Sequence, residues 1–309
     1  MIPLIVILGP TSSGKSDLAI RLAKKFNGEI VSADSRQVYK GLDIGTGKVT
    51  KREQKMVPHH LLDVARPGVR FTLARYKKGA DAAIKDIWKR GKLPLLVGGS
   101  ALYIKAVVEG YRVPAVRPNL KLRADLEAQP LANLLKLLKQ FDQKTYRRID
   151  KKNTRRVIRA LEIIYETGKP IPALTKEHPY DALMIGLNIA RDKLYSLINA
   201  RVDARAQKGM IREVERLIEQ GVSKKWLKNL GLEYRYITEY VEIKPSLVTR
   251  HSLLVARASM LARLKCAIHD FARRQLVWWR KEGHIHWISD YAQPEKLVRK
   301  FMNEKKHEQ

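Results

Sequence analysis

A glycine-rich loop near the start of the chain constrains the fold more than any other feature. Residues 2–8 are an apolar, β-branched run that predicts a buried strand, and apolar residues at helical spacing begin after residue 17. The segment between them matches the pattern Gly-x-x-x-x-Gly-Lys-Ser/Thr at every fixed position, as Gly9, Pro10, Thr11, Ser12, Ser13, Gly14, Lys15 and Ser16. A strand, this loop and a helix in succession predict a P-loop NTPase-like α/β fold.

The residue types in this loop suit a phosphate group. Glycine lets backbone N–H groups turn inward around an anion, and the start of the following helix adds the positive end of its dipole. Lys15 neutralises phosphate charge, and the Ser16 hydroxyl is a ligand for Mg²⁺. We therefore predict that residues 9–16 bind a phosphate group, with Mg²⁺ at Ser16, although the loop alone does not show which phosphate compound. The alternative is a strand-to-helix turn without a ligand.

The rest of the chain alternates strand and helix signals, with one interruption. Apolar runs that predict further strands occur at residues 29–33, 93–97 and 183–189. Strands alternating with helices predict a parallel sheet with covering helices. Residues 121–168, in contrast, are helical in pattern throughout. We therefore predict a core made of residues 1–111 and 181–309, with a helical insertion domain at residues 112–180.

An acidic residue follows the second predicted strand but not the third. The strand that ends at Val97 runs into residues 98–100 without the carboxylate that NTPases place there for Mg²⁺. Asp34 follows the second strand instead, and parallel strands present their carboxyl ends on one edge of a sheet. We expect Asp34 beside the loop as a general base, a Mg²⁺ ligand or a helix cap, and the local sequence does not choose among these roles.

The net charge of +30 points to a polyanionic partner. Lys and Arg total 61 against 31 Asp and Glu, which is far more than solubility requires. Nucleic acid, a phosphorylated ligand and an acidic membrane surface all fit this charge. No apolar run reaches the length of a membrane span.

Cysteine and histidine give little sign of a metal centre. The single cysteine, Cys266, excludes a disulfide framework and a Cys-based zinc site, and its apolar helical neighbours predict a place in the core. His59 and His60 have no acidic residue at metal-ligand spacing, so we expect structural roles. The cysteine count and the lack of an export signal favour the cytoplasm, and the lack of heptads favours a monomer.

Several blocks of the sequence resemble, in order, the bacterial tRNA dimethylallyltransferases. After the phosphate loop these are Ser-Ala-Asp-Ser-Arg-Gln-Val-Tyr at 32–39, Asp-Ile-Gly-Thr-Gly-Lys at 43–48, Pro-His-His-Leu-Leu-Asp at 58–63 and Pro-Leu-Leu-Val-Gly-Gly-Ser at 94–100. Later blocks are Arg156 with Arg-Ala-Leu-Glu at 159–162, Gly-Met at 209–210 with Glu213, Gly-Leu-Glu-Tyr at 231–234, and Arg-Arg-Gln at 273–275 with Trp278. The ordered set is much more specific than the loop alone.

The resemblance implies a fold, an activity and a set of reacting groups. The family has a nucleotide-kinase-like core with a helical insertion and transfers a dimethylallyl group from dimethylallyl diphosphate. The acceptor is the exocyclic amine of the adenine just 3′ of the anticodon in tRNA. By position, Asp34 would be the base that takes the amine proton, and Thr11 would contact the oxygen that links the diphosphate to the allyl carbon. Lys15, Mg²⁺ near Ser16 and Arg274 would stabilise the departing diphosphate.

The resemblance also implies which residues contact tRNA. The segment Asp34, Ser35, Arg36 and Gln37 matches the one that reads a flipped adenine, and an amide such as that of Gln37 can pair with an adenine edge. Ser100, a threonine in most of the family, and Arg123 match positions close to the tRNA. The insertion adds Arg155, Arg156, Val157, Ile158 and Arg159.

A basic run in the insertion supports the same expectation. Between Lys144 and Arg159, eight of sixteen residues are basic and only Asp150 is acidic. Such a run predicts either a contact with the tRNA backbone or a solvated surface. Arg159 also lies three residues before Glu162, which allows an ion pair within the helix.

Two adjacent tryptophans occur near the end of the long C-terminal helix. Aromatic side chains there could stack on bases. Packing is the favoured role for both Trp278 and Trp279, and Trp278 matches a packing position of the family.

Three other functions remain open at this stage. A P-loop nucleoside or metabolite kinase would explain the loop but not the charge of +30 or the missing acid after Val97. An adenylate prenyltransferase would share the donor site but needs no basic insertion. A non-enzymatic RNA-binding protein would not need Asp34, Thr11, Lys15 and Arg274 together.

Overall fold

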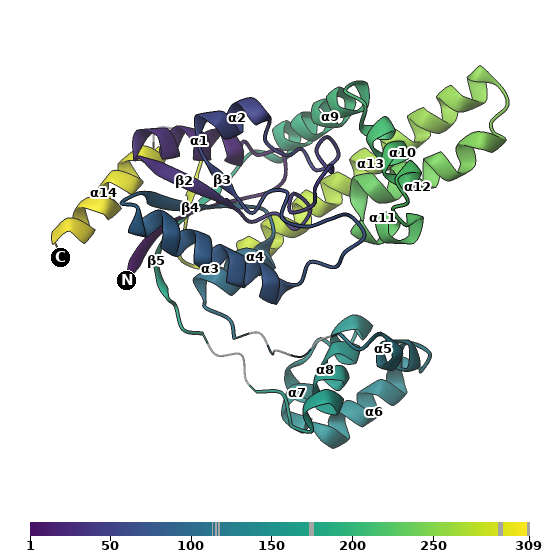
Figure 1. The fold of residues 1–309 in the computed structure, drawn as a ribbon, viewed down its shortest axis with the longest axis horizontal. Coiled ribbons are helices and arrows are strands. Elements are labelled where there is room, and N and C mark those ends of the chain that lie inside the picture. The colour runs from purple at the N-terminus through teal and green to yellow at the C-terminus, as the bar shows by residue number, and fades with distance from the viewer. Residues whose placement is uncertain (113, 115, 117, 173–175, 290–292, 308–309) are drawn as a thin grey trace. The chain divides into compact units, whose positions relative to one another are not determined.

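The computed structural model describes residues 1–112, 114, 116, 118–172, 176–289 and 293–307. The chain divides into two compact units (Figure 1), with unit 1 formed by Met1–Glu109 and His178–Gln309 and unit 2 by Gly110–Glu177. These bounds lie within three residues of the insertion expected at 112–180. Within the described residues, no helix is long and apolar enough to cross a membrane.

Unit 1 is built on a parallel sheet of six described strands, in the order β3-β2-β4-β1-β5-β6. The strands are β1 (Ile2–Leu8), β2 (Gly28–Ser32), β3 (His59–His60), β4 (Leu93–Gly98), β5 (Tyr180–Leu187) and β6 (Ile285–Ile288). The α/β fold predicted from the sequence is confirmed. Because β1, β4 and β2 are neighbours in the sheet, the segments that follow these three strands come together at its carboxyl edge.

Helices cover both faces of this sheet (Figure 1), which explains why the central strands β1 and β4 are apolar along their whole length. Successive side chains of a strand point to opposite faces. Leu4 and Val6 therefore pack in one core cluster, while Ile5 and Ile7 pack in another. The helices of these two layers are α1 (Lys15–Lys25), α2 (Lys51–Met56), α3 (Leu73–Lys89), α4 (Ala101–Val108) and α14 (Gln293–His307).

A group of helices after β5 forms a third core cluster beside the sheet. They are α9 (Arg191–Gln207), α10 (Met210–Glu219), α11 (Lys224–Leu230), α12 (Leu232–Ile243), the short 3₁₀ helix η1 (Lys244–Ser246) and α13 (Arg250–Trp279). Buried residues such as Ile198, Met210, Tyr234 and Leu264 hold this group together. The 30-residue helix α13 contacts α12 and α9 and then reaches α4, so its last turns lie at the carboxyl edge of the sheet.

Unit 2 is helical. Its helices are α5 (Leu120–Glu127), α6 (Leu131–Phe141), α7 (Gln143–Arg148) and α8 (Thr154–Thr167). The side chains of Asn119 and Asn153 cap α5 and α8 by accepting backbone N–H groups, and Gly168 ends α8 in the left-handed conformation with φ of 63°. Leu134 and Leu161 are fully buried in the small core between these helices.

The environment of Cys266 differs from the core position expected from the sequence. Cys266 is exposed on α13, whereas its neighbours Leu264 and Ile268 are buried. Apolar residues around a position do not show which side of a long helix faces the core, because that depends on what packs against it.

Candidate active site

The phosphate loop has the geometry that its glycines predict. Gly9 adopts φ of 147° and Gly14 adopts φ of 84°, values that side chains disfavour, and a Cβ at Gly9 would lie 3.3 Å from the backbone oxygen of Leu187. Helix α1 begins at Lys15, so the loop leads directly into a helix N-terminus. Lys15 folds back over the loop and donates from Nζ to the carbonyl oxygen of Pro10 at 2.5 Å.

A cavity of about 1400 Å³ opens beside this loop. Its lining includes loop residues 11–16, the segment after β2 with Asp34, Ser35, Arg36 and Gln37, the segment 98–100 after β4, and Arg274 from α13. Segments that the sequence analysis grouped by strand order therefore share one cavity. Two of the predicted loop residues, Gly9 and Pro10, are buried behind its wall.

Asp34 projects one carboxylate oxygen toward the backbone and leaves the other free. Its Oδ1 accepts the N–H of Arg36 at 2.9 Å and that of Gln37 at 3.4 Å. Among the described residues, no hydrogen bond or ion pair occupies Oδ2. Asp34 therefore caps its own turn with one oxygen and can accept a proton with the other.

The neighbours of Asp34 are held by contacts that cross the cavity. The backbone N–H of Ser35 donates to Ser100 Oγ at 3.1 Å, which links the segments after β2 and β4. Arg36 pairs with Glu233 at 3.1 Å and lies over the ring of Phe271 at 5.6 Å. These two contacts hold the guanidinium group of Arg36 in place in the absence of a ligand.

Three basic side chains in the cavity, those of Lys15, Arg201 and Arg205, are buried enough to disfavour their charged forms. Burial and the nearby charge of Arg201 lower the pKa of Lys15 to about 7, although Asp34 opposes the shift. Burial and the charge of Arg205 lower the pKa of Arg201 to about 10, and burial also lowers that of Arg205. An anion bound among these three side chains would stabilise their charged forms and raise their pKa values again.

Arg201 and Arg205 were missed by the sequence analysis. They lie four residues apart on α9, so they share a face of the helix, and that face lines the cavity. The spacing was visible in the sequence. The contact of α9 with the site was not, because α9 lies more than 150 residues after the loop.

Arg274 and Gln275 have different roles at the same end of α13. Arg274 is exposed to the cavity and forms no ion pair with any described residue. Gln275 is buried, accepts the backbone N–H of Thr11 at 2.9 Å and donates to the carbonyl oxygen of Gly99 at 2.9 Å. Gln275 thus joins the phosphate loop to the segment that carries Ser100, a role that the sequence analysis did not assign.

The two tryptophans differ in exposure. Trp279 is fully buried, whereas Trp278 is 37% exposed and lines the cavity. Lys105 Nζ lies 5.0 Å from the centre of the Trp278 ring. Its ring also packs edge-on against that of Trp279, with ring centres 5.0 Å apart, so Trp278 combines the expected packing with an exposed surface at the cavity. Adjacent residues on a helix face different directions, and the sequence did not show which of the two faces the core.

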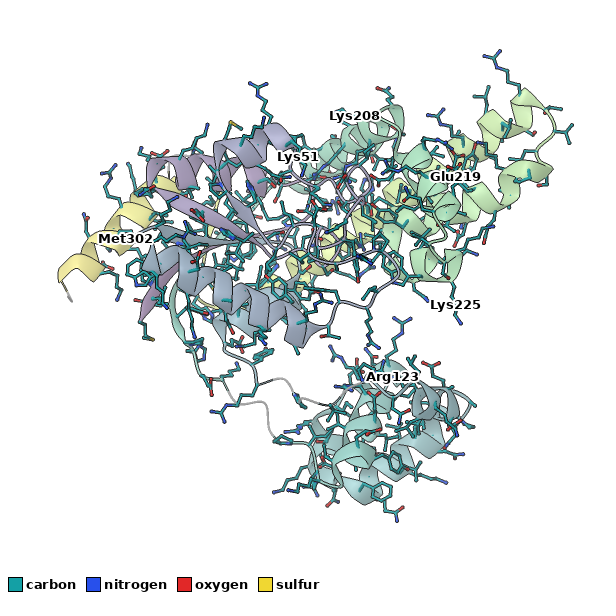
Figure 2. The ribbon with its side chains drawn as sticks, in the orientation of Figure 1. Lys51, Arg123, Lys208, Glu219, Lys225 and Met302 are labelled. Carbon is teal, nitrogen blue, oxygen red and sulfur yellow. The ribbon has the colours of Figure 1, made fainter. Side chains whose placement is uncertain are left out.

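Glu162 organises the predicted RNA-binding arginines of unit 2. It is completely buried and accepts two hydrogen bonds at 2.7 Å from Arg123, which is labelled in Figure 2, and another from Arg159. Burial would raise the pKa of Glu162, but the hydrogen bonds from these arginines outweigh it and lower the pKa to about 2. The ion pair between Arg159 and Glu162, one of the options open from the sequence, is present.

The remaining residues of that predicted set divide by exposure. Arg155 and Arg156 are exposed on α8. Val157 is 0% exposed and Ile158 is 4% exposed, because both pack into the core of unit 2. The side chains of Val157 and Ile158 are therefore closed to RNA, and the prediction that these two residues contact tRNA is left to their backbone groups.

The histidine pair is structural, as expected. His60 Nε2 lies 2.7 Å from Oε2 of Glu29, a buried carboxylate on β2 that also accepts hydrogen bonds from Arg90 and Lys92. The hydrogen bonds from Arg90, Lys92 and His60 lower the pKa of Glu29, although burial opposes this. No group of three or more His, Cys, Asp or Glu suited to a metal occurs among the described residues.

The parallel sheet, the phosphate loop after its central strand and the cavity beside it define a protein of the P-loop NTPase-like class. A model of one family, described as IPP transferase, matches residues 37–282. The chain belongs to this family and is a prenyltransferase. The resemblance to tRNA dimethylallyltransferases is thus confirmed and is favoured over the kinase alternative.

Relatives and solved structures agree with this assignment. A tRNA dimethylallyltransferase of Roseiflexus sp. (strain RS-1) is 45% identical over 291 residues, 92% of each chain. A crystal structure of the full-length tRNA isopentenylpyrophosphate transferase from Bacillus halodurans is 35% identical, with a TM-score of 0.71 over 100% of this chain and 98% of that one. A eukaryotic dimethylallyltransferase described as acting on tRNA is 26% identical, with a TM-score of 0.78 over 98% of this chain and 78% of that one.

Proposed function

We propose that the protein transfers a dimethylallyl group from dimethylallyl diphosphate to the exocyclic amine of the adenine 3′ of the anticodon in tRNA, with release of diphosphate. One observation carries this proposal. The cavity combines a phosphate loop with the free carboxylate oxygen of Asp34, while the strand that supplies the Mg²⁺-binding acid in NTPases ends here in Gly98. This arrangement suits an acceptor that must lose a proton beside a diphosphate that must leave.

In the reaction, the adenine amine attacks the first carbon of the donor. A bond forms between that carbon and the amine nitrogen, and the bond from the carbon to the diphosphate oxygen breaks with its electron pair. The amine proton passes to Oδ2 of Asp34. The Oδ1 atom stays in its hydrogen bonds to the backbone at 2.9 and 3.4 Å, which hold the carboxylate in place during the transfer.

The departing diphosphate gains negative charge, and the cavity supplies donors for it. These are the N–H groups of the phosphate loop, Lys15, Arg274 and the Thr11 hydroxyl at the linking oxygen. We add Arg201 and Arg205, because both line the same cavity and their pKa values are lowered while no anion is bound. Preorganised donors of this kind each contribute about 10²–10³ in rate.

The site fits Mg²⁺ in a limited way. Ser16 lies exposed at the start of α1 and lines the cavity, and no cluster of three acidic or histidine residues is present among the described residues. Such a donor set suits an ion held mostly by phosphate oxygens and water, with Ser16 as its protein ligand. When bound there, Mg²⁺ would neutralise charge on the diphosphate.

The acceptor reaches the cavity only when the target adenine leaves the anticodon stack. We propose that Ser35, Arg36 and Gln37 contact this base and that Ser100 holds their segment through its bond to the Ser35 N–H. In unit 2, the exposed Arg155 and Arg156, with Arg123 and Arg159 at the edge of the Glu162 cluster, would contact the tRNA backbone. Location in the cytoplasm and a monomeric state stay predictions of the sequence.

The decisive experiment gives the protein Mg²⁺, labelled dimethylallyl diphosphate and one of two acceptors. We expect label in tRNA and none in adenosine monophosphate. Label in the monophosphate alone would identify an adenylate prenyltransferase and contradict the proposal. Phosphoryl transfer from ATP without prenylation would identify a kinase. A tRNA that carries guanine in place of the target adenine is the matched acceptor control.

A further inference from the structure

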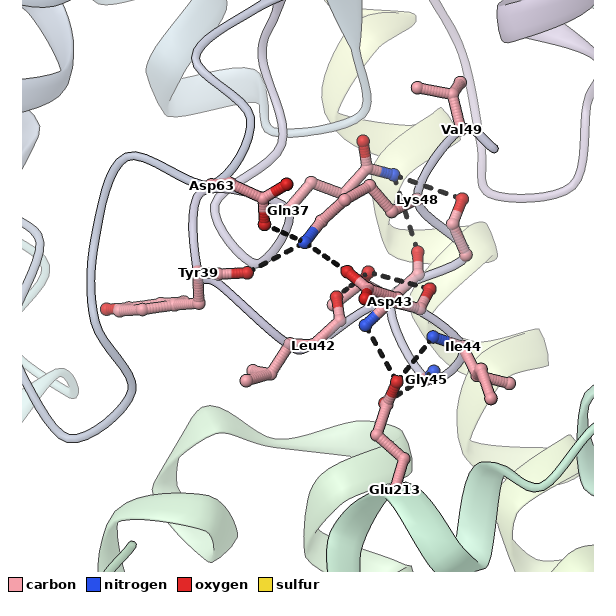
Figure 3. A network of polar contacts seen from close by, with 12 residues as sticks. Gln37, Tyr39, Leu42, Asp43, Ile44, Gly45, Lys48, Val49, Asp63 and Glu213 are labelled. Atoms are coloured by element: carbon pink, nitrogen blue, oxygen red, sulfur yellow. Dashed lines mark hydrogen bonds and ion pairs between the residues drawn. The ribbon is translucent and has the colours of Figure 1, made fainter. Parts of the chain in front are cut away.

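Glu213 on α10 is a buried carboxylate with an unusual set of partners. It accepts three consecutive backbone N–H groups, from Asp43 at 2.8 Å, Ile44 at 2.7 Å and Gly45 at 3.0 Å (Figure 3). Tyr234 donates its hydroxyl to the same carboxylate at 2.9 Å. Glu213 therefore holds one end of the loop formed by residues 43–48.

The partners of other buried glutamates show why this arrangement is distinctive. Glu29, Glu162 and Glu233 each pair with at least one arginine. Among the described residues, no lysine or arginine forms an ion pair with Glu213. A buried carboxylate needs partners for its charge, and at Glu213 the backbone of the 43–48 loop provides most of them.

The carbonyl groups of the same loop bind site residues. Gly45 O accepts from Arg205 at 3.2 Å, and Gly47 O accepts from Arg201 at 3.4 Å. The side-chain amide of Gln37 donates to Thr46 O at 3.5 Å and to Gly47 O at 3.4 Å. The loop is thus bound through its N–H groups by Glu213 and through its carbonyl groups by three residues that line the cavity.

Two further features leave the loop little freedom. Lys48, whose side chain is 3% exposed, donates to Tyr39 O at 2.8 Å and to the carboxylates of Asp43 and Asp63 at 2.6 Å each (Figure 3). A Cβ at Gly45 would lie 2.8 Å from the ring of Tyr234. The loop is therefore a rigid spacer between α10 and the cavity, and a shift at Glu213 would be transmitted to the cavity side.

We propose that Glu213 is a positioning residue for the transfer reaction: it fixes the 43–48 loop, whose carbonyl groups align Gln37 for the adenine and Arg201 and Arg205 for the diphosphate. This inference rests on the proposed function for its catalytic consequence. Glu213 does not line the cavity. It acts only through the loop.

The test replaces Glu213 with its isosteric amide in the full chain. In Glu213→Gln, one oxygen becomes an NH₂ group that faces backbone N–H donors, so the loop must shift. We expect kcat/KM for tRNA to fall by about 10- to 100-fold, because small misplacements of reacting groups have effects of this size. The matched control is Glu215→Gln on the same helix, whose carboxylate pairs with Lys244 and Arg212 near the surface, and it should keep its activity.

Two readouts separate positioning from loss of fold. Hydrogen exchange of the 43–45 amides should accelerate in Glu213→Gln while the amides of β1 stay protected. Inorganic pyrophosphate, used as the probe in calorimetry, should bind more weakly because Arg201 and Arg205 lose alignment. A folded Glu213→Gln protein with unchanged amide exchange, pyrophosphate affinity and kcat/KM would overturn the proposal.

A second variant covers the case in which Glu213→Gln does not fold. Tyr234→Phe removes one of the four donors to the carboxylate, and we expect a drop in kcat/KM of about three- to tenfold, as for a single hydrogen bond. Wild-type rates in Tyr234→Phe, with no change in the exchange of the 43–45 amides, would contradict the inference. If the wild-type protein transfers no prenyl group, the proposed function fails, while amide exchange and pyrophosphate binding still decide whether Glu213 positions the loop.

Discussion

The two units of the molecule hold their positive charges in different ways. In unit 1, Lys15, Arg201 and Arg205 surround a cavity, and burial lowers the pKa of each. In unit 2, Arg155 and Arg156 are exposed on the surface of a helix. Cations that are buried at fixed points suit a small anion of defined shape, such as a diphosphate. Exposed cations on long, flexible side chains suit an extended polyanion, because such side chains can contact its phosphates in several arrangements.

The comparison predicts that changes in the cavity affect the chemical step, whereas changes on unit 2 affect tRNA affinity. The largest expected effect is that of Asp34→Asn. An amide keeps an oxygen for the N–H groups of Arg36 and Gln37, so the turn persists, but it cannot accept the amine proton. We expect kcat to fall by about 10²–10⁴, measured by single-turnover prenylation with tRNA saturating.

Asp192→Asn is the matched control for Asp34→Asn, because Asp192 is 94% exposed at the start of α9. It should keep wild-type kcat. Asp34 would lose its assignment as base if the folded Asp34→Asn protein turned over at the wild-type rate.

A second change in the cavity is Arg274→Ala. Loss of a donor that stabilises the departing diphosphate should lower kcat by about 10²–10³. The neighbouring Arg273 provides the control, since it pairs with Asp270 at the surface with 67% of its side chain exposed. Equal rates for Arg274→Ala and Arg273→Ala would remove Arg274 from the diphosphate site.

The double change Arg155→Ala with Arg156→Ala tests whether the exposed arginines of unit 2 contribute to tRNA affinity. If each arginine meets one phosphate, the slope of log affinity against log salt becomes less steep by about two. Between 50 and 200 mM salt, wild-type tRNA affinity should therefore fall about tenfold more than that of the variant. Filter binding or fluorescence anisotropy gives both slopes, and kcat at saturating tRNA should not change.

The control for this change is Lys224→Ala with Lys225→Ala, two exposed lysines on α11 of unit 1. Both double variants lose two charges, so an effect of net charge alone would appear in each. Identical salt slopes for the wild type and the Arg155 and Arg156 variant would show that these arginines form a solvated surface only.

The smallest predicted effect concerns the pH dependence of diphosphate binding. The pKa of Lys15 is lowered to about 7, so in the empty site the lysine is increasingly neutral above that pH and must take up a proton when it pairs with diphosphate. Pyrophosphate affinity should weaken by about fivefold between pH 7 and pH 8 from this group alone.

Comparison with Lys15→Arg isolates this effect from the titration of the ligand itself, because arginine stays charged over this range. Calorimetry from pH 6.5 to 9 should show a steeper loss of affinity in the wild type than in Lys15→Arg. Parallel curves would mean that Lys15 stays protonated in the empty site.

The same lowered pKa has the opposite effect on folding stability. Between about pH 7 and 10.5 the lysine is protonated in the unfolded chain but not in the folded one, so the contribution of Lys15 to the free energy of unfolding rises with pH over this range.

Signals that are local in the sequence predicted the fold correctly and indicated which loop and which carboxylate line the cavity. The apolar run of β1, the loop pattern and the helical spacing of α1 are contiguous, so their geometry follows from backbone sterics and hydrogen bonding alone. The position of Asp34 beside the loop also followed, because parallel strands place their carboxyl ends on one edge.

The sequence by itself therefore determined the α/β core, the phosphate loop and Asp34 at the sheet edge. Only the tertiary structure decided that Arg201, Arg205 and Gln275 join the site beside the expected Arg274, and that Glu213 holds the loop next to it. It also decided that Val157 is buried beside exposed Arg156, and that Trp278 rather than Trp279 faces the cavity. Helical periodicity shows which residues share a face, but only packing against partners more than a hundred residues away selects the face that meets the cavity.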